Sequence, residues 1–299
     1  MKGTLFLNLK SGVKLSPLET QALVAAAGDA GLDVIELSPD VDVGQTVRAH
    51  LARGTRLFLA AGGDGTVHHV MQSLVHTDAC LGVLPIGTYN NFARDLGIPI
   101  GWRAALEVAL DGERRQVDTG RVNDRFFLNN VSIGLYPELV ARREERGRDY
   151  PRWKARLYAA YTTLRKYRHV TMTVETEHHR EAIRTHVFIV SNNTYDLSRI
   201  GIMRAPRSLL DEGRLSVYWL PHTPRVQLMK VVARYLAGRV REVPFRSFRT
   251  LRMRVQSSRD HLHVGLDGEV FTMQTPLVIT IVPQSLLVKA PRMGGVPAG

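Results

Sequence analysis

The first third of the chain alternates short apolar runs with stretches of helical periodicity. One helix start is explicit, because Ser16 suits the N-cap, Pro17 suits the first helical position and Glu19 completes a capping box. Strands separated by helical patterns of about ten to fifteen residues are typical of a parallel sheet. We therefore predict an α/β domain with a doubly wound parallel sheet. Its strands are expected at residues 4–9, 33–37, 56–61 and 81–84, and its helices at 17–28, 43–53 and 67–75.

The pattern changes after Asp118, where strand-like segments become frequent. Leu251, Met253 and Val255 alternate with polar residues, which is typical of a strand with one buried face. Further strands are expected at residues 125–132, 170–177, 183–192, 261–271 and 277–282, and helices at 153–167 and 224–236. We predict two domains, a nucleotide-binding domain over residues 1–118 and a β-rich, mainly antiparallel domain over 119–299, with a strand at 286–290 returning to the first.

Composition narrows the class of protein but does not decide the function. Forty Lys and Arg against 28 Asp and Glu give a formal net charge of +12, which suits nucleic acid, an anionic membrane surface or phosphate-bearing substrates. Cys80 is the single cysteine, so an internal disulfide framework is excluded and a cytoplasmic location is expected. No apolar run approaches the ~18 residues that span a bilayer, and the start is typical of a strand, not of a signal peptide.

The strongest local signal is Gly62-Gly63-Asp64-Gly65-Thr66, directly after an apolar strand and before a helix. Glycines let the backbone approach phosphate oxygens, and a helix N-terminus favours an anion. Phosphate alone would repel Asp64, so this residue suggests a cation such as Mg²⁺ bridging nucleotide phosphates. The alternative is a tight strand-to-helix turn in which Asp64 caps the helix. The segment fits neither GxxxxGK[ST] nor GxGxxG.

Two more polar loops follow predicted strands of the same sheet. One runs from Pro85 to Phe92, where Thr88 can donate to a phosphate and Asn90 can cap the next helix. The other begins at Asn8 and contains Gly12. The carboxyl ends of parallel strands meet at one edge of the sheet, so we expect all three loops to converge there.

Taken together, these segments resemble the diacylglycerol kinase catalytic domain family of soluble bacterial lipid kinases, whose superfamily includes sphingosine and ceramide kinases and is related to NAD kinases. The resemblance covers nearly the whole chain. It rests on the glycine motif, on Pro85-Ile86-Gly87-Thr88-Tyr89-Asn90-Asn91-Phe92-Ala93, and on Leu266-Asp267-Gly268-Glu269. Residues 117–120, 127–134, 191–193 and 205–215 match other parts of the family.

The resemblance implies an ATP-dependent kinase that phosphorylates a lipid hydroxyl, most simply that of diacylglycerol, with Mg²⁺. It implies that Glu269, with Asp267 beside it, is the catalytic base and that Asp64 meets the nucleotide-bound Mg²⁺. The nucleotide site that it implies consists of Asn8, Leu9, Lys10, Ser11, Gly12, Ser38, Gly62, Gly63, Asp64, Gly65, Thr66, Val67 and Thr88. Asp267-Gly268 is also a favoured hairpin turn, which is the structural alternative for this pair.

Three positions depart from the family pattern. Asn91 stands where the family usually has an acid, and Leu9 replaces the usual Pro. Glu212 replaces an Asp in a segment where the family can bind a second, structural metal. The positions matching that metal site are Leu209, Glu212 and Arg214. Glu is longer by one methylene, and octahedral Mg²⁺ tolerates misplaced ligands poorly.

A basic segment at residues 142–168 holds ten Lys and Arg against three acids, beside apolar residues at helical spacing. It predicts either peripheral association with the inner face of the membrane or a helix packed on its own domain. An NAD kinase-like activity shares the glycine motif but does not predict Glu269, and Asn91 keeps a non-catalytic basic relative open. With 7% aromatics we expect no nucleic acid partner. A homodimer is left open.

Overall fold

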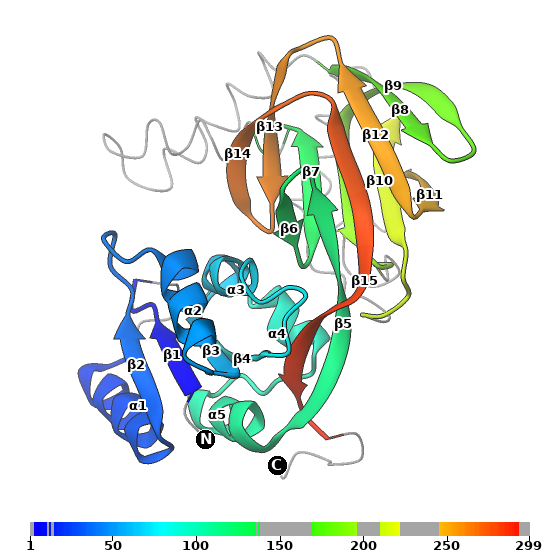
Figure 1. Cartoon of the computed structure of the whole chain (residues 1–299). Coiled ribbons are helices and arrows are strands. Elements are labelled where there is room, and N and C mark those ends of the chain that lie inside the picture. Colours follow the sequence, from blue (N-terminus) through cyan, green and yellow to red (C-terminus); the bar gives the residue numbers. More distant parts are fainter. Residues whose placement is uncertain are drawn as a thin grey trace, which may run out of the picture. The chain divides into compact units, whose positions relative to one another are not determined.

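The computed structural model describes residues 3–10, 12, 15–135, 137, 169–195, 210–221 and 245–292 (Figure 1). These residues form two compact units. The first contains the described residues up to Thr119 together with 210–213 and 282–292, and the second contains those of 120–195 and 214–281. The helices expected at residues 153–167 and 224–236 lie outside the described residues.

The first unit is built on a parallel sheet of buried strands. Its strand order is β4-β3-β1-β2, and every neighbouring pair is parallel. The strands are β1 (Gly3–Leu7), β2 (Leu32–Glu36), β3 (Leu57–Gly62) and β4 (Cys80–Pro85). All residues of β1, β3 and β4 are buried, as expected for a sheet covered on both faces. The predicted parallel sheet is confirmed.

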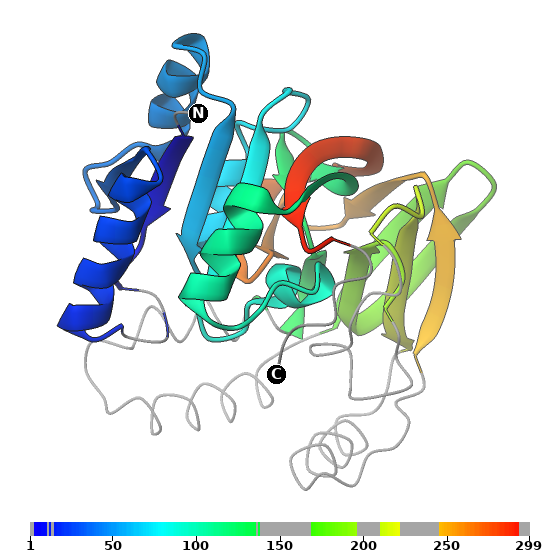
Figure 2. The same cartoon turned by 90° about the horizontal axis from the view of Figure 1, so that it is seen from below.

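Helices cover both faces of this sheet. Figure 2 shows α1 and α5 in front of the strands and α2 behind them, and α2 bonds the turn after α3 through Arg48 and Ser73. The helices are α1 (Pro17–Asp29), α2 (Val43–Ala52), α3 (Asp64–Met71), α4 (Asn91–Asp95) and α5 (Trp102–Asp111). The capping box of α1 is present, and the backbone N–H and hydroxyl of Ser16 lower the pKa of Glu19.

The end of the chain supplies a further strand to the first unit. β15 (Leu277–Ala290) is one long strand where the sequence predicts two, and its last part pairs in parallel with β4 through Leu287 and Val288. Figure 1 shows this part in dark red. β5 (Glu113–Val122) pairs with β15 as well.

The second unit is a β structure with mainly antiparallel pairing, as predicted. Its strand order is β14-β13-β7-β9-β8-β12-β15, and β10 pairs with β9 and β11. The strands are β6 (Arg125–Phe127), β7 (Asn130–Gly134), β8 (Val170–Thr176), β9 (Arg180–Asn192), β10 (Leu215–Pro221), β11 (Arg246–Thr250), β12 (Arg252–Ser257), β13 (His261–Leu266) and β14 (Glu269–Gln274). Its core contains Phe127, Phe188 and Val264, all fully buried.

Some element limits differ from the sequence prediction. The alternation assigned to β12 holds for Met253 and Val255, which are buried, but Leu251 lies before the strand and is 50% exposed. The strand expected over residues 125–132 is divided into β6 and β7. Helix α5 was not predicted, although Trp102, Ala105 and Ala109 are buried at helical spacing.

Candidate active site

The carboxyl edge of the parallel sheet brings the first loop against the start of α3. The backbone N–H of Asn8 donates to the carbonyl of Ala61 (2.9 Å), at the end of β3. Its side-chain Nδ2 donates to Oγ1 of Thr66 (3.0 Å), and its Oδ1 accepts from the N–H of Lys10 (3.1 Å). Asn8 therefore links the loop after β1 to the glycine motif, as the convergence at this edge predicts.

Glycines stand at three positions of this edge where a side chain would collide with a neighbouring residue. A Cβ at Gly62 would lie 2.2 Å from Oγ1 of Thr66, and a Cβ at Gly87 would lie 2.2 Å from Cα of Gly63. A Cβ at Gly12 would lie 2.5 Å from the backbone nitrogen of Thr88. No side chain fits at these three positions, so the edge is a close-packed cradle made largely of backbone. A close-packed glycine edge at the N-terminus of a helix is the kind of place where backbone N–H groups can bind phosphate.

Asp64 occupies the first turn of α3, so the helix begins three residues earlier than predicted. Gly63 takes the N-cap position in an extended conformation, and Asp64 follows it. The alternative in which Asp64 itself is the cap is therefore wrong. Its Oδ1 accepts from the backbone N–H of Phe92 (3.2 Å), in the first turn of α4. The positive end of α3 stabilises this carboxylate, and the bond to Phe92 links two of the three loops.

The loop after β4 is held by the side chain of Asn90. Its Nδ2 donates to the carbonyls of Pro85 (3.2 Å) and Gly87 (2.9 Å), and its Oδ1 accepts from the N–H of Gly87 (3.0 Å). The backbone of Asn90 is left-handed, with φ 51°, and its side chain makes no cap bond to α4. Asn90 stands at the N-cap position of α4, as expected, but its side chain does not cap the helix because the amide is used within its own turn. Thr88 lies exposed at the tip of this turn.

The remaining predicted nucleotide residues differ in their surroundings. Val67 is buried, Leu9 is half-buried and Lys10 is exposed. Ser38 lies exposed in the turn after β2, where its carbonyl accepts from the N–H of Val41. Gly65 follows Asp64 in the first turn of α3, and its carbonyl bonds the ring of His69. Ser11 lies outside the described residues. The contacts above join the loops after β1, β3 and β4. The nucleotide role of these residues, Ser38 included, stays a prediction.

In the second unit, Asp267 and Gly268 form the turn between β13 and β14. Both have positive φ (50° and 100°), and Leu266 pairs with Glu269 across the turn. This is the two-residue hairpin favoured by Asp-Gly. The structural alternative, in which Asp267-Gly268 forms a hairpin turn, is therefore correct for this pair. It does not bear on Glu269, whose catalytic role stays a prediction.

The carboxylate of Asp267 is engaged by three backbone amides. Its Oδ2 accepts from the N–H of Leu128 (2.7 Å), and its Oδ1 accepts from those of Asn129 (2.7 Å) and Asn130 (3.1 Å). Asp267 is 7% exposed. A buried carboxylate with three short amide bonds fixes the β6–β7 turn, which explains why residues 125–132 form two strands. Glu269, half-buried at the first position of β14, is placed by the same turn.

A buried asparagine network adjoins this turn and was not assigned a role from the sequence. Nδ2 of Asn192 donates to the carbonyl of Leu128 (3.0 Å), and Nδ2 of Asn193 donates to Oδ1 of Asn192 (3.0 Å). Nδ2 of Asn130 donates to Oη of Tyr195 (2.9 Å). The sequence signal is a pair of adjacent asparagines at the end of an apolar strand, where burial requires bonded partners.

The predicted structural metal site falls at a place where three segments of the first unit meet. The buried carboxylate of Asp118 accepts from the N–H groups of Gly213 (2.7 Å) and Gln284 (2.8 Å). Glu212 is half-buried beside Gly213, and the carbonyl of Arg214, in the second unit, accepts from an N–H of that unit.

Leu209 lies outside the described residues. Within the described ranges no group of three or more His, Cys, Asp or Glu side chains could hold a metal ion. The structural metal at Leu209, Glu212 and Arg214 stays a prediction.

The basic segment at residues 142–168 also lies outside the described residues. None of the described helices is both long enough and apolar enough to cross a membrane.

Comparisons with known proteins cover both units. The model of the Diacylglycerol kinase catalytic domain matches residues 2–122, and that of the YegS C-terminal NAD kinase beta sandwich-like domain matches residues 130–290. A diacylglycerol kinase of Mycobacterium tuberculosis (strain CDC 1551 / Oshkosh) is 27% identical over 302 residues, which cover 98% of this chain and 96% of that protein.

Two solved structures share the fold. A diacylglycerol kinase from Bacillus anthracis strain Sterne has a TM-score of 0.68 at 20% identity and covers 97% of this chain and 96% of its own. An NAD kinase from Archaeoglobus fulgidus, solved in complex with ATP, has a TM-score of 0.55 at 13% identity and covers 98% of this chain and 94% of its own. With both halves matched in order, the chain belongs to the lipid kinase family that joins a diacylglycerol kinase catalytic domain to a YegS C-terminal NAD kinase beta sandwich-like domain.

Proposed function

We propose that this kinase transfers the γ-phosphoryl group of ATP to the hydroxyl of a lipid, with diacylglycerol as the first candidate. The observation that carries the proposal is the cradle at the carboxyl edge, where Asn8 bonds Thr66 and a Cβ at Gly87 would overlap Gly63. A backbone cradle of this kind suits a polyphosphate. The diacylglycerol kinase of Mycobacterium tuberculosis, similar over the whole chain, supports a lipid acceptor, and the ATP complex of the NAD kinase supports ATP as donor.

The residues of the cradle fit a nucleotide-bound Mg²⁺. Such a metal is usually held by one or two carboxylates together with phosphate oxygens, and Asp64 supplies a carboxylate at this edge. Asn91, the first residue of α4, carries a neutral amide where an acid would add charge. When bound, the metal would neutralise charge on the phosphates. We assign Asp64 to hold it.

The reaction that we propose displaces ADP from the γ-phosphorus by the lipid hydroxyl oxygen. The hydroxyl proton passes to the carboxylate of Glu269, and the new bond joins the lipid oxygen to phosphorus. Asp267 has a different role in this proposal, because its two oxygens already accept three backbone N–H groups. It positions the turn that carries Glu269 and does not itself take the proton.

A panel assay tests the proposal. The chain is incubated with labelled ATP and Mg²⁺ in mixed micelles that contain diacylglycerol, sphingosine, ceramide or no lipid, and a separate lane contains NAD. We expect label in a lipid product, and loss of that label with Asp64→Asn. Labelled NAD phosphate with no labelled lipid would instead establish the NAD kinase-like alternative. The fold that the chain shares with the Archaeoglobus NAD kinase is the reason for including this lane. No labelled product in any lane would contradict both.

We also propose peripheral membrane association through residues 142–168. The support is the excess of seven positive charges within 27 residues, in a family whose substrates are lipids. Each basic residue near an anionic surface contributes about 1 kcal/mol, and the attraction decays within about a Debye length. Binding to vesicles that contain phosphatidylglycerol should therefore weaken steeply as salt rises, in a cosedimentation assay with neutral vesicles as the control.

A further inference from the structure

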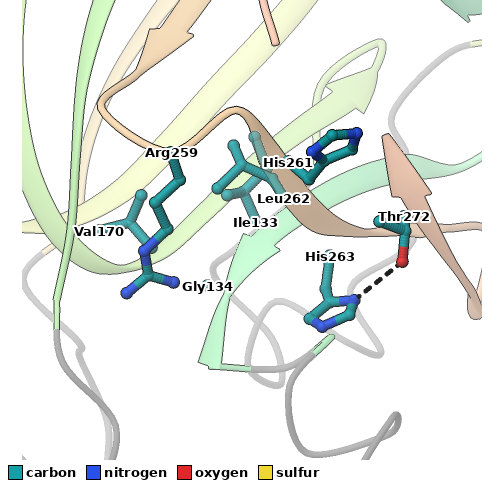
Figure 3. Close-up of a pocket in the computed structure, with 8 residues that line it drawn as sticks. All are labelled: Ile133, Gly134, Val170, Arg259, His261, Leu262, His263 and Thr272. Carbon is teal, nitrogen blue, oxygen red and sulfur yellow. Dashed lines mark hydrogen bonds between the residues drawn. The ribbon is translucent and has the colours of Figure 1, made fainter. Parts of the chain in front are cut away.

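A cavity of about 130 Å³ opens in the second unit at the ends of β7 and β13. Among the described residues, its polar lining consists of Arg259, His261, His263 and Thr272, and the other lining residues are apolar or glycine (Figure 3). His261 and His263 are alternate residues of β13 and both are exposed, while Leu262 between them is buried. The cavity therefore has an apolar floor and a rim that carries a guanidinium and two imidazoles.

The guanidinium and imidazole groups of this rim have no anionic partner in the described part of the chain. No described residue bonds or pairs with the Arg259 guanidinium or the His261 ring, and no Asp or Glu is among the described lining residues. His263 Nδ1 lies 3.3 Å from Oγ1 of Thr272 on the neighbouring strand. In Figure 3 the Arg259 guanidinium ends beside Gly134, and a dashed line joins the His263 ring to Thr272.

The chemistry of the lining selects an oxyanion. A guanidinium offers up to five N–H donors in a planar fork that matches phosphate, and an imidazole donates an N–H in either protonation state. One water occupies about 10–15 Å³ of such space, so a cavity of about 130 Å³ has room for a tetrahedral phosphate group. An uncharged lipid tail would leave these donors without acceptors, which is costly.

We propose that Arg259, His261, His263 and Thr272 form a binding site for a phosphate group, separate from the ATP phosphates. The site lies at the end of the β13–β14 hairpin opposite Glu269, because His261 is five positions along β13 from Leu266, the partner of Glu269. At about 3.4 Å per residue this is roughly 17 Å along the strand. The phosphate could come from an anionic lipid headgroup or from free phosphate. The proposal does not rest on the proposed kinase reaction.

Ring signals in NMR spectra of the whole chain test the site without any need for activity. Inorganic phosphate is titrated at constant ionic strength, and the ring C–H signals of His261 and His263 are followed, with His261→Gln and His263→Gln used for assignment. We expect saturable shifts. Arg259→Gln removes a charged hydrogen-bond donor and should raise the dissociation constant for phosphate by about ten- to a hundredfold. Arg252→Gln, which removes an exposed arginine of β12 outside the cavity, is the matched control and should change it less than about twofold.

Vesicle cosedimentation then identifies the source of the phosphate. Vesicles of phosphatidylcholine with phosphatidylglycerol are compared with phosphatidylcholine alone, in buffer without phosphate. Weaker sedimentation of Arg259→Gln than of Arg252→Gln supports a headgroup, and equal sedimentation supports a free phosphate as ligand. Absence of saturable ring shifts in the wild-type chain, or equal dissociation constants for wild type and Arg259→Gln, overturns the site. As a control, the thermal unfolding midpoints of Arg259→Gln and Arg252→Gln are measured. Midpoints equal to that of the wild type show that both variants are folded.

Discussion

The carboxylate of Asp267 offers a test that separates structure from chemistry at the hairpin turn. Asp267→Asn keeps the size of the side chain and removes the charge. Asn tolerates the left-handed backbone of a tight hairpin turn, so the φ of 50° at this position is retained without strain. The change therefore acts on the three amide bonds and on little else.

The size of the effect follows from those bonds. The remaining oxygen of Asn can still accept from Asn129 and Asn130, while its amide nitrogen faces the N–H of Leu128, donor against donor. One hydrogen bond to a charged group, about 1.5–3 kcal/mol, is lost, and the other two become neutral bonds of about half the strength. Relief from burying the charge offsets part of this. We expect the free energy of unfolding to fall by about 2–4 kcal/mol.

The assay pairs Asp267→Asn with Glu269→Gln. Urea unfolding followed by circular dichroism gives the loss of stability, and labelled-phosphate transfer gives turnover. Glu269 is half-buried, so Glu269→Gln should cost about 1 kcal/mol or less while turnover falls by about 10² or more, since the proton acceptor is removed. Asp267→Asn should show the opposite pattern, with a large loss of stability and a smaller loss of turnover. Its turnover is measured at a temperature at which the variant is still folded.

One result would refute this division of roles. Suppose that Asp267→Asn has the same urea midpoint of unfolding as the wild type and loses turnover as severely as Glu269→Gln. In that case the carboxylate acts in the chemistry and the three bonds contribute little to stability. Undiminished turnover of Glu269→Gln on a lipid that the wild type phosphorylates would remove Glu269 from the mechanism.

The first unit yields further predictions. Asp64→Asn should abolish phosphoryl transfer and leave the thermal midpoint nearly unchanged, and a large stability loss with activity retained would contradict its metal role. Asn91→Asp adds a carboxylate beside the metal region and should lower the free Mg²⁺ needed for half-maximal activity; superimposed Mg²⁺ titrations would place Asn91 beyond the metal's reach. Gly87→Ala forces a Cβ to 2.2 Å from Gly63 and should cost about 1–3 kcal/mol with loss of ATP binding, whereas Gly28→Ala, with open space around it, should be neutral or stabilising, and equal effects would contradict the packing of the cradle.

The parallel sheet of the first unit was predictable because its strands are apolar throughout and its helices carry local signals. The capping box at Ser16 is a contact between neighbours, so the start of α1 was correct. The start of α3 was predicted three residues too late. Gly63 and Asp64 are residue types typical of loops, and only their position directly after β3 makes Gly63 the N-cap. Asn90 illustrates the same limit: a helix cap and a bond within the turn use the same amide, and only the tertiary position of Gly87 decides between them.

The candidate site was predictable only as far as its motifs are contiguous. The glycine segment, the loop at Thr88 and the hairpin at Asp267 were all found. The bonds of Asp267 to Leu128 and Asn129 join residues 138 or more positions apart, and no local pattern encodes them. The lining of the cavity carries no motif either, and Thr272 meets His263 only because β14 pairs with β13.

Asp118 decides whether the first unit can exist without the rest of the chain. Its buried carboxylate bonds Gly213 and Gln284, and the chain passes from one unit to the other next to all three, after Thr119, after Gly213 and before Val282. A fragment that ends at Thr119 would retain the glycine motif but lose both amide partners and the part of β15 that pairs with the outer side of β4. The nucleotide half is thus discontinuous in the gene although it is continuous in space. Truncation should yield an unfolded polypeptide, so recombination within this family would have to exchange whole chains or surface loops.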